Sequence, residues 1–116
     1  MAPTITREEL KTKMDHGDDF VLVEALSQKH YRGSHLPGAI NLPYEFVDEA
    51  EKVLPDKGAE IVVYCMNPDC VASAEEAREL EEMGYARVFH YAAGKQDWIR
   101  AGLPIEVSRV RDRWQA

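Results

Sequence analysis

Two cysteines, Cys65 and Cys70, are the residues whose type and spacing are best suited to chemistry in this sequence. They lie between residues 61–64, an apolar run that predicts a strand covered on both faces, and a helix predicted to begin at Ser73. Asn67-Pro68-Asp69 between them predicts a turn, because proline fixes φ and Asn and Asp tolerate tight conformations. In open α/β sheets, ligands bind beyond the carboxyl ends of strands.

The junction between a strand and a helix also favours a negatively charged sulfur. Backbone N–H groups and the positive end of a helix dipole stabilise an anion there, including a thiolate. The start of the chain has no basic segment followed by an apolar run, and no run approaches the roughly 18 apolar residues that would span a bilayer. We therefore expect a cytoplasmic protein with reduced thiols and no membrane contact. Two cysteines five positions apart on a loop are then expected to be reactive.

The composition is that of one soluble domain of 116 residues. The formal net charge of −7 argues against a nucleic-acid partner, because binding to phosphates needs clustered Lys and Arg.

The elements that must position the cysteines alternate along the chain. Strands are predicted at 20–24, 40–42, 61–64 and 87–90, and helices from Thr6, at 44–53, at 73–83 and at 95–101. This alternation predicts a mainly parallel sheet covered on both sides. Capping boxes are predicted at Thr6/Glu9 and at Ser73/Glu76. The acidic residues of the helix 73–83 are expected to form a solvated face: Glu75, Glu76, Glu79, Glu81 and Glu82.

Four segments, in this order, resemble the rhodanese (sulfurtransferase) domain family: Val21-Leu22-Val23-Glu24; Ser34-His35-Leu36-Pro37-Gly38-Ala39-Ile40-Asn41-Leu42-Pro43; Ile61-Val62-Val63-Tyr64-Cys65; and Gly84-Tyr85 with Gly94-x-x-x-Trp98 and Gly102-Leu103-Pro104. The resemblance covers residues 4–106 and leaves 107–116 as a C-terminal extension. It implies an α/β fold with a five-stranded, mainly parallel sheet and helices on both faces. It also implies transfer of sulfane sulfur through a cysteine persulfide, with no metal or organic cofactor.

The resemblance assigns the nucleophile to Cys65, which directly follows the strand. A sulfur-accepting cysteine must be nucleophilic near neutral pH, and loop amides together with the helix N-terminus would stabilise its thiolate. Cys70 has three open interpretations: it resolves a persulfide or sulfenate on Cys65 by forming a disulfide, it carries sulfur itself, or it only packs under the loop. The expected anion cradle consists of Met66, Asn67, Pro68, Asp69, Val71, Ala72 and Ser73.

Two departures from the family pattern bear on the sulfur donor. Common rhodanese loops run six positions from the cysteine to a serine preceded by arginine; here eight positions separate Cys65 from Ser73, and Ala72 stands where the arginine would be. Glu24-Ala25-Leu26 replaces the usual Asp-x-Arg. Arginine would bind an anionic donor such as thiosulfate. We therefore expect a small-molecule or protein persulfide as donor and a thiol as acceptor.

Three other functions compete with sulfur transfer for this sequence. Phosphatases and arsenate reductases of similar fold need an arginine for their oxyanion, and none lies between Cys65 and Ser73. A zinc site needs about four closely spaced ligands, whereas the four histidines are scattered. The rival from another class is a catalytically inert rhodanese-like module for protein interaction or redox sensing.

Several single residues have more than one interpretation. His35 is expected to structure its own loop, with a catalytic role as the alternative, and His90 either packs or lines the pocket. Asp69 either caps the turn or raises the pKa of the nearby thiol. Trp98 is expected to anchor the core. Val110 and Trp114 pack either on the domain or on a second subunit.

Overall fold

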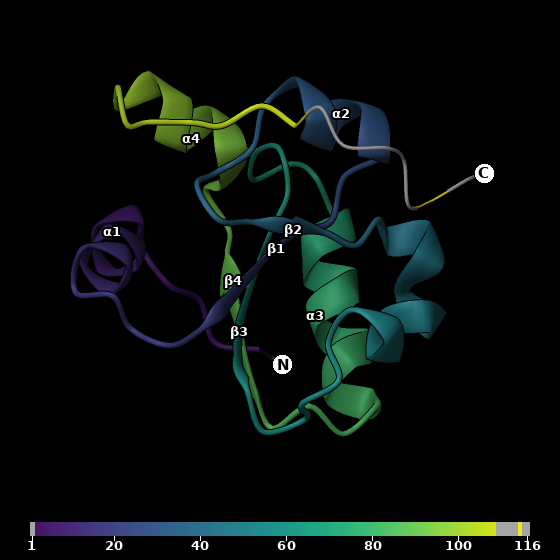
Figure 1. Cartoon of the computed structure of the whole chain (residues 1–116). Coiled ribbons are helices and arrows are strands. Elements are labelled where there is room, and N and C mark those ends of the chain that lie inside the picture. The colour runs from purple at the N-terminus through teal and green to yellow at the C-terminus, as the bar shows by residue number, and fades with distance from the viewer. Residues whose placement is uncertain (1, 109–113, 115–116) are drawn as a thin grey trace.

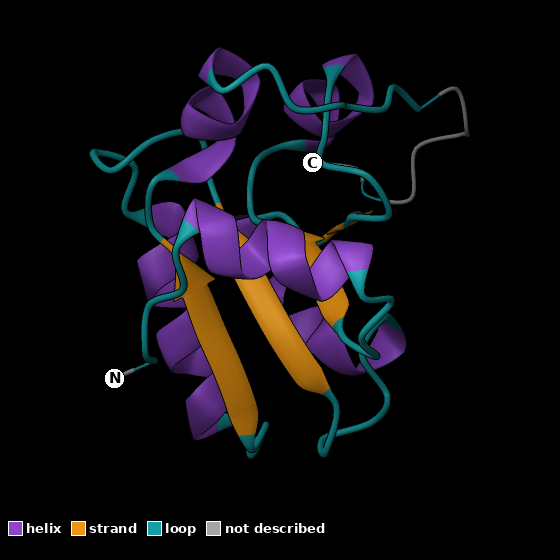
Figure 2. Ribbon diagram, turned by 90° about the vertical axis from the view of Figure 1, so that its left-hand side faces the viewer, coloured by secondary structure: helices purple, strands orange, loops and turns teal. Residues whose placement is uncertain are grey.

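The chain folds into an α/β domain in which helices lie on both sides of a parallel sheet (Figures 1 and 2). The coordinates are a computed structural model that describes residues 2–108 and 114. The elements are α1 (Arg7–Asp15), β1 (Val21–Glu24), α2 (Gln28–Gly33), β2 (Ile40–Asn41), η1 (Tyr44–Lys52), β3 (Glu60–Tyr64), α3 (Ala72–Glu82), β4 (Arg87–Tyr91) and α4 (Gly94–Arg100).

The sheet has four strands in the order β2-β1-β3-β4, and every pairing is parallel. The expected count of five is wrong for the described residues. At the outer edge of β4 the N-terminal segment forms only an isolated bridge, through the His90 N–H to the Pro3 carbonyl (2.8 Å) and the Ile5 N–H to the His90 carbonyl (3.0 Å). Pro3 has no N–H to extend this pairing.

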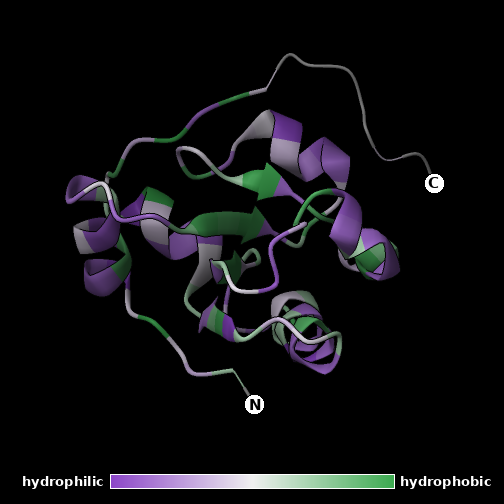
Figure 3. Ribbon diagram, turned by 60° about the horizontal axis from the view of Figure 1, so that its bottom comes forward, coloured by the Kyte–Doolittle hydropathy of each residue, from purple (hydrophilic) through white to green (hydrophobic). Residues whose placement is uncertain are grey.

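Each face of the sheet buries its own apolar cluster because alternate side chains of a strand point to opposite faces. Val23, Ile61 and Val63 face α3 and η1. Leu22, Val62 and Tyr64 pack with Leu10 of α1 and Trp98 of α4, so Trp98 anchors the core as predicted. Figure 3 shows the hydrophobic strands at the centre and the hydrophilic outer surfaces of the helices. Within residues 2–108, no helix has both the length and the apolar character needed to cross a bilayer.

The two predicted capping boxes have opposite outcomes. Thr6 and Glu9 form theirs, with the Glu9 N–H to Thr6 Oγ1 at 3.0 Å and the Thr6 N–H to Glu9 Oε1 at 2.9 Å. The Ser73/Glu76 box is wrong, because α3 begins at Ala72 and its N-cap, Val71, makes no side-chain cap. Ser73 and Glu76 are instead buried on the face of α3 that packs on the sheet.

Two further expectations change in detail. The helix predicted at 44–53 is a 3₁₀ helix, η1, that spans Tyr44–Lys52 and has non-helical φ and ψ at Phe46 and Glu49. Trp114 packs on the domain: its ring stacks on Phe46 at 5.2 Å, and its Nε1–H donates to the Asn41 carbonyl at 2.9 Å. Val110 lies outside the described residues.

Candidate active site

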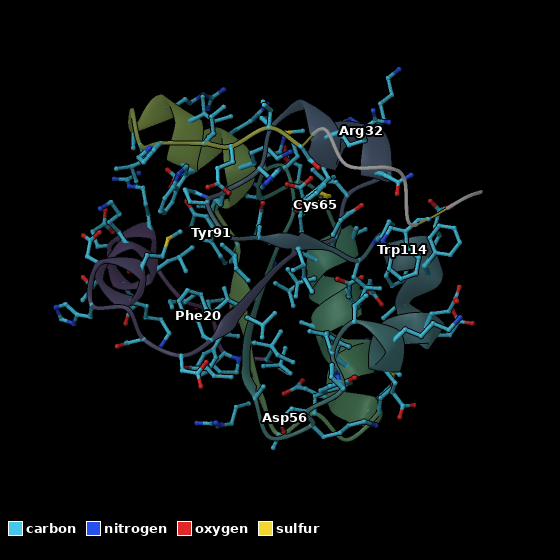
Figure 4. The ribbon with its side chains drawn as sticks, viewed as in Figure 1. Phe20, Arg32, Asp56, Cys65, Tyr91 and Trp114 are labelled. Carbon is cyan, nitrogen blue, oxygen red and sulfur yellow. A yellow bond between two sulfur atoms is a disulfide. The ribbon has the colours of Figure 1, made fainter. Side chains whose placement is uncertain are left out.

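Cys65 and Cys70 lie beyond the carboxyl end of β3 and are joined by a disulfide (Figure 4). The expectation of two reduced thiols therefore does not describe this structure. The Cα atoms are 6.3 Å apart, within the range of about 4.4–6.8 Å that a disulfide spans. Cys65 is 1% exposed, whereas Cys70 is only partly buried. A reagent that enters from solvent therefore meets Cys70 first. Residues 65–71 are called the cysteine loop below.

The turn predicted within the cysteine loop is present and brings Cys70 back toward Cys65. The Cys70 N–H donates to the Asn67 carbonyl at 3.1 Å, which closes a four-residue turn with Pro68 at its second position. The Asn67 side chain tightens this turn by accepting from the Asp69 N–H at 3.0 Å.

This turn makes the anion cradle smaller than expected. The N–H groups of Asp69 and Cys70 are already paired, and Pro68 has none. Five backbone N–H groups of the expected cradle donate to no acceptor within the part of the chain that the structure describes. They belong to Met66, Asn67, Val71, Ala72 and Ser73.

The N-terminus of α3 supplies the remaining positive potential beside the cysteines. No side chain caps it, so the first N–H groups of the helix keep their capacity to stabilise an anion. Ser73, the expected cap, instead shares a hydrogen bond with His90, with Oγ and Nε2 2.8 Å apart. Burial lowers the pKa of His90 and favours the neutral imidazole. His90 therefore holds β4 against the start of α3.

Below the cysteine loop lies a fully buried polar network built on Glu24, Tyr64 and Lys95. The Glu24 carboxylate accepts from the Tyr64 hydroxyl at 2.7 Å and from the Lys95 ammonium at 3.0 Å. Burial raises the pKa of Glu24, and the neighbouring Lys95 charge opposes that rise. Burial also raises the pKa of Tyr64, so its hydroxyl stays protonated and donates. Lys95 also donates to the carbonyls of His30 (3.2 Å) and Ser34 (2.5 Å), and so ties α2 to this network.

The start of α4 fixes the backbone on which Cys65 stands. The Lys95 N–H donates to the Cys65 carbonyl at 2.9 Å, and the Gln96 N–H donates to the Met66 carbonyl at 2.8 Å. Gly94 permits this approach: its φ is +79°, and a Cβ there would lie 2.7 Å from the carbonyl carbon of Met66. Sequence reasoning matched Gly94 to a family pattern but missed Lys95, because no local pattern marks a lysine whose partner lies 71 positions away.

His35 structures its own loop as predicted. Its Nδ1 lies 2.8 Å from the Tyr31 carbonyl, and its ring stacks on the Tyr31 ring with centroids 4.0 Å apart. The His35 backbone pairs with Glu106 in both directions at 2.9 Å. This pairing brings the segment after α4 beside the loop that follows α2.

Fold and site together define a small parallel α/β domain in which a cysteine lies at the carboxyl end of a central strand. The rhodanese-like domain family matches residues 6–101, and the chain belongs to this family. The chain is 32% identical over 104 residues to the thiosulfate sulfurtransferase GlpE of Haemophilus influenzae, covering 90% of this chain and 94% of that protein.

The chain is also similar to two further proteins. The chain is 33% identical over 103 residues to the HTH-type transcriptional regulator Rv0324 of Mycobacterium tuberculosis; the match covers 88% of this chain but only 44% of that relative. Among solved structures, the rhodanese-like domain of the Anabaena protein Alr3790 superposes with a TM-score of 0.80 at 25% identity, covering 100% of this chain and 92% of that one.

Proposed function

We propose that the protein is a sulfurtransferase in which reduced Cys65 accepts a sulfane sulfur and carries it as a persulfide to a thiol acceptor. The observation that carries this proposal is the position of Cys65: it follows the buried strand β3, its carbonyl is held by the Lys95 N–H, and the uncapped N-terminus of α3 lies at the other end of its loop. Family membership and the likeness to a sulfurtransferase support it.

The proposed transfer has two displacement steps. The Cys65 thiolate attacks the outer sulfur of a donor persulfide, RSSH; a new S–S bond forms, and the donor leaves as the thiolate RS⁻. An acceptor thiolate then attacks the outer sulfur on Cys65 and takes it, and Cys65 leaves as a thiolate. The free N–H groups of the cysteine loop and of α3 stabilise the thiolate in both steps.

The charge of the site favours a donor without a large negative charge. No arginine lies in residues 66–73. Arg78, six residues after the start of α3, is exposed and bonds to Glu75 at 2.5 Å and to Glu82 at 3.4 Å. Lys95 is buried with its three donors used by Glu24, His30 and Ser34. Neither residues 66–73 nor Arg78 nor Lys95 therefore supplies an unpaired cation to a sulfonate group such as that of thiosulfate, whereas a persulfide needs only amides.

The test is sulfur loading of the reduced protein, followed by intact mass. Cys65→Ser and Cys70→Ser are each reduced, freed of reductant and exposed to glutathione persulfide or to thiosulfate. Cys70→Ser should gain the mass of one sulfur atom from the persulfide and little from thiosulfate. Cys65→Ser should gain none. A gain on Cys65→Ser alone would move the carrier to Cys70, and no gain on either variant would refute the proposal.

A thiol-reactivity measurement separates this proposal from an inert module. In Cys70→Ser, the rate of alkylation of Cys65 is followed from pH 5 to pH 9. The proposal requires half-maximal reactivity well below pH 8.5, about the value for an ordinary cysteine. An ordinary profile without persulfide formation would indicate an inert module.

A further inference from the structure

Simple sulfur transfer needs only one cysteine, whereas in this structure Cys65 is bonded to a second cysteine, Cys70. We infer that Cys70 attacks the Cys65 persulfide, so that the domain also reduces sulfane sulfur to hydrosulfide. This inference rests on the proposed function and extends it from a transferase to a sulfane reductase whose product state is the observed disulfide.

The local geometry prepares Cys70 for this attack on the inner sulfur, the Sγ of Cys65. The turn Asn67-Pro68-Asp69-Cys70 is closed by two hydrogen bonds of 3.1 and 3.0 Å, and it directs Cys70 toward the end of β3. Across the site, the carbonyl of Cys65 is fixed by the Lys95 N–H. The two sulfurs therefore meet without any rearrangement of the sheet or of α4, and the step is intramolecular.

The reaction balances in atoms and electrons. The Cys70 thiolate bonds to the Sγ of Cys65 and breaks the S–S bond of the persulfide, and the outer sulfur leaves as HS⁻. The sulfane sulfur is reduced by two electrons, and the two cysteine sulfurs are oxidised to the disulfide. An external dithiol can then reduce the disulfide and become a disulfide itself, and this step returns both cysteines to the start of the cycle.

The burial of the two cysteines fixes the direction of that reduction. The incoming dithiol reaches Cys70, which is partly buried, rather than Cys65, which is 1% exposed. Cys65 then leaves as the thiolate, which under the proposed function is stabilised by the free amides of the cysteine loop and by the uncapped N-terminus of α3. A more stable thiolate is the better leaving group in thiol–disulfide exchange. The protein therefore works downstream of a reaction that generates persulfides and upstream of a dithiol reductant.

The test is a single turnover of the reduced wild-type protein with an equimolar amount of glutathione persulfide and no added thiol. We expect about one equivalent of sulfide, loss of both free thiols and a mass lower than that of the reduced protein by two hydrogen atoms. The matched control, Cys70→Ser, should hold the added sulfur and release sulfide only at a rate proportional to added glutathione. In the wild-type protein the release rate should not depend on glutathione.

The outcomes separate this inference from the proposed function. A wild-type persulfide as stable as that of Cys70→Ser, or sulfide release that depends equally on glutathione in both proteins, would overturn sulfane reduction and leave the transferase standing. Retention of the sulfur on Cys70, found by peptide mapping without sulfide release, would also overturn it. Absence of added sulfur on both Cys70→Ser and Cys65→Ser would refute the transferase itself.

Discussion

Replacing Glu76 by glutamine should stabilise the protein, by an amount that increases with pH. Glu76 is 0% exposed, and neither of its carboxyl oxygens has a hydrogen-bond partner among the residues described by the structure. Burial, and secondarily the charge of Glu79, raises the pKa of Glu76 well above its ordinary value. A carboxyl group in this setting holds its proton in the folded protein and releases it when the chain unfolds.

The sign and size of the effect follow from this difference in protonation. In the unfolded chain the pKa of a glutamate is about 4.3. Between that pH and the raised pKa in the fold, the folded state binds one more proton, so the free energy of unfolding falls by about 1.4 kcal/mol for each pH unit. From pH 5 to pH 7 the free energy of unfolding of the wild-type protein would fall by as much as about 2.7 kcal/mol relative to that of Glu76→Gln, because the glutamine has no proton to release.

The assay is urea unfolding at pH 5, 6 and 7 for the wild-type protein, Glu76→Gln and Glu82→Gln, all in the disulfide form. Glu82 is an exposed residue of the same helix, so its replacement should leave the pH dependence unchanged. The gap between Glu76→Gln and the wild-type protein should widen with pH. A gap that stays constant, or a wild-type protein that is the more stable at pH 7, would refute the reasoning.

Three further substitutions test the packing around the site. Lys95→Met leaves the buried Glu24 carboxylate without its cation and should cost about 3–5 kcal/mol in urea unfolding, with partial recovery in Lys95→Met/Glu24→Gln. Trp114→Ala should cost about 3–5 kcal/mol, because a buried, stacked and hydrogen-bonded ring is removed; a loss below about 1 kcal/mol would contradict its anchoring role. Gly94→Ala should lower the free energy of unfolding by more than Gly17→Ala does, and it should slow sulfur loading. Both glycines have a positive φ, but of the two only Gly94 contacts the cysteine loop. Equal losses of about 1–2 kcal/mol would indicate left-handed strain alone.

The features predicted correctly from the sequence depend on neighbours in the chain. The continuous apolar run before Cys65 indicated a strand covered on both faces, and β3 is such a strand. Asn67, Pro68 and Asp69 predicted the turn that the structure contains. The Thr6/Glu9 capping box formed because both partners lie within one helical turn.

The errors at Ser73 and Glu76 share a cause, which is competition from partners that are distant in the sequence. Ser73 and Glu76 have the spacing of a capping box, but the hydroxyl of Ser73 pairs with His90, 17 positions away, and Glu76 faces the core. The prediction that all five glutamates of this helix are solvated is therefore wrong for Glu76, which is buried. The fifth strand failed because a proline at the edge of β4 limits the pairing to two hydrogen bonds.

Residues a few positions apart encode the order of strands and helices, the place of Cys65 at a strand end and the turn that carries Cys70, so these features could be predicted before folding was known. Three others arise only when distant segments pack together: Lys95 lies beneath Cys65 with Glu24, Trp114 closes the core beside Phe46, and the two cysteines bond to each other. Those outcomes depend on which side chains share a buried volume. Pairing of buried charges and packing of rings are set by that volume and by the cost of leaving polar groups without partners.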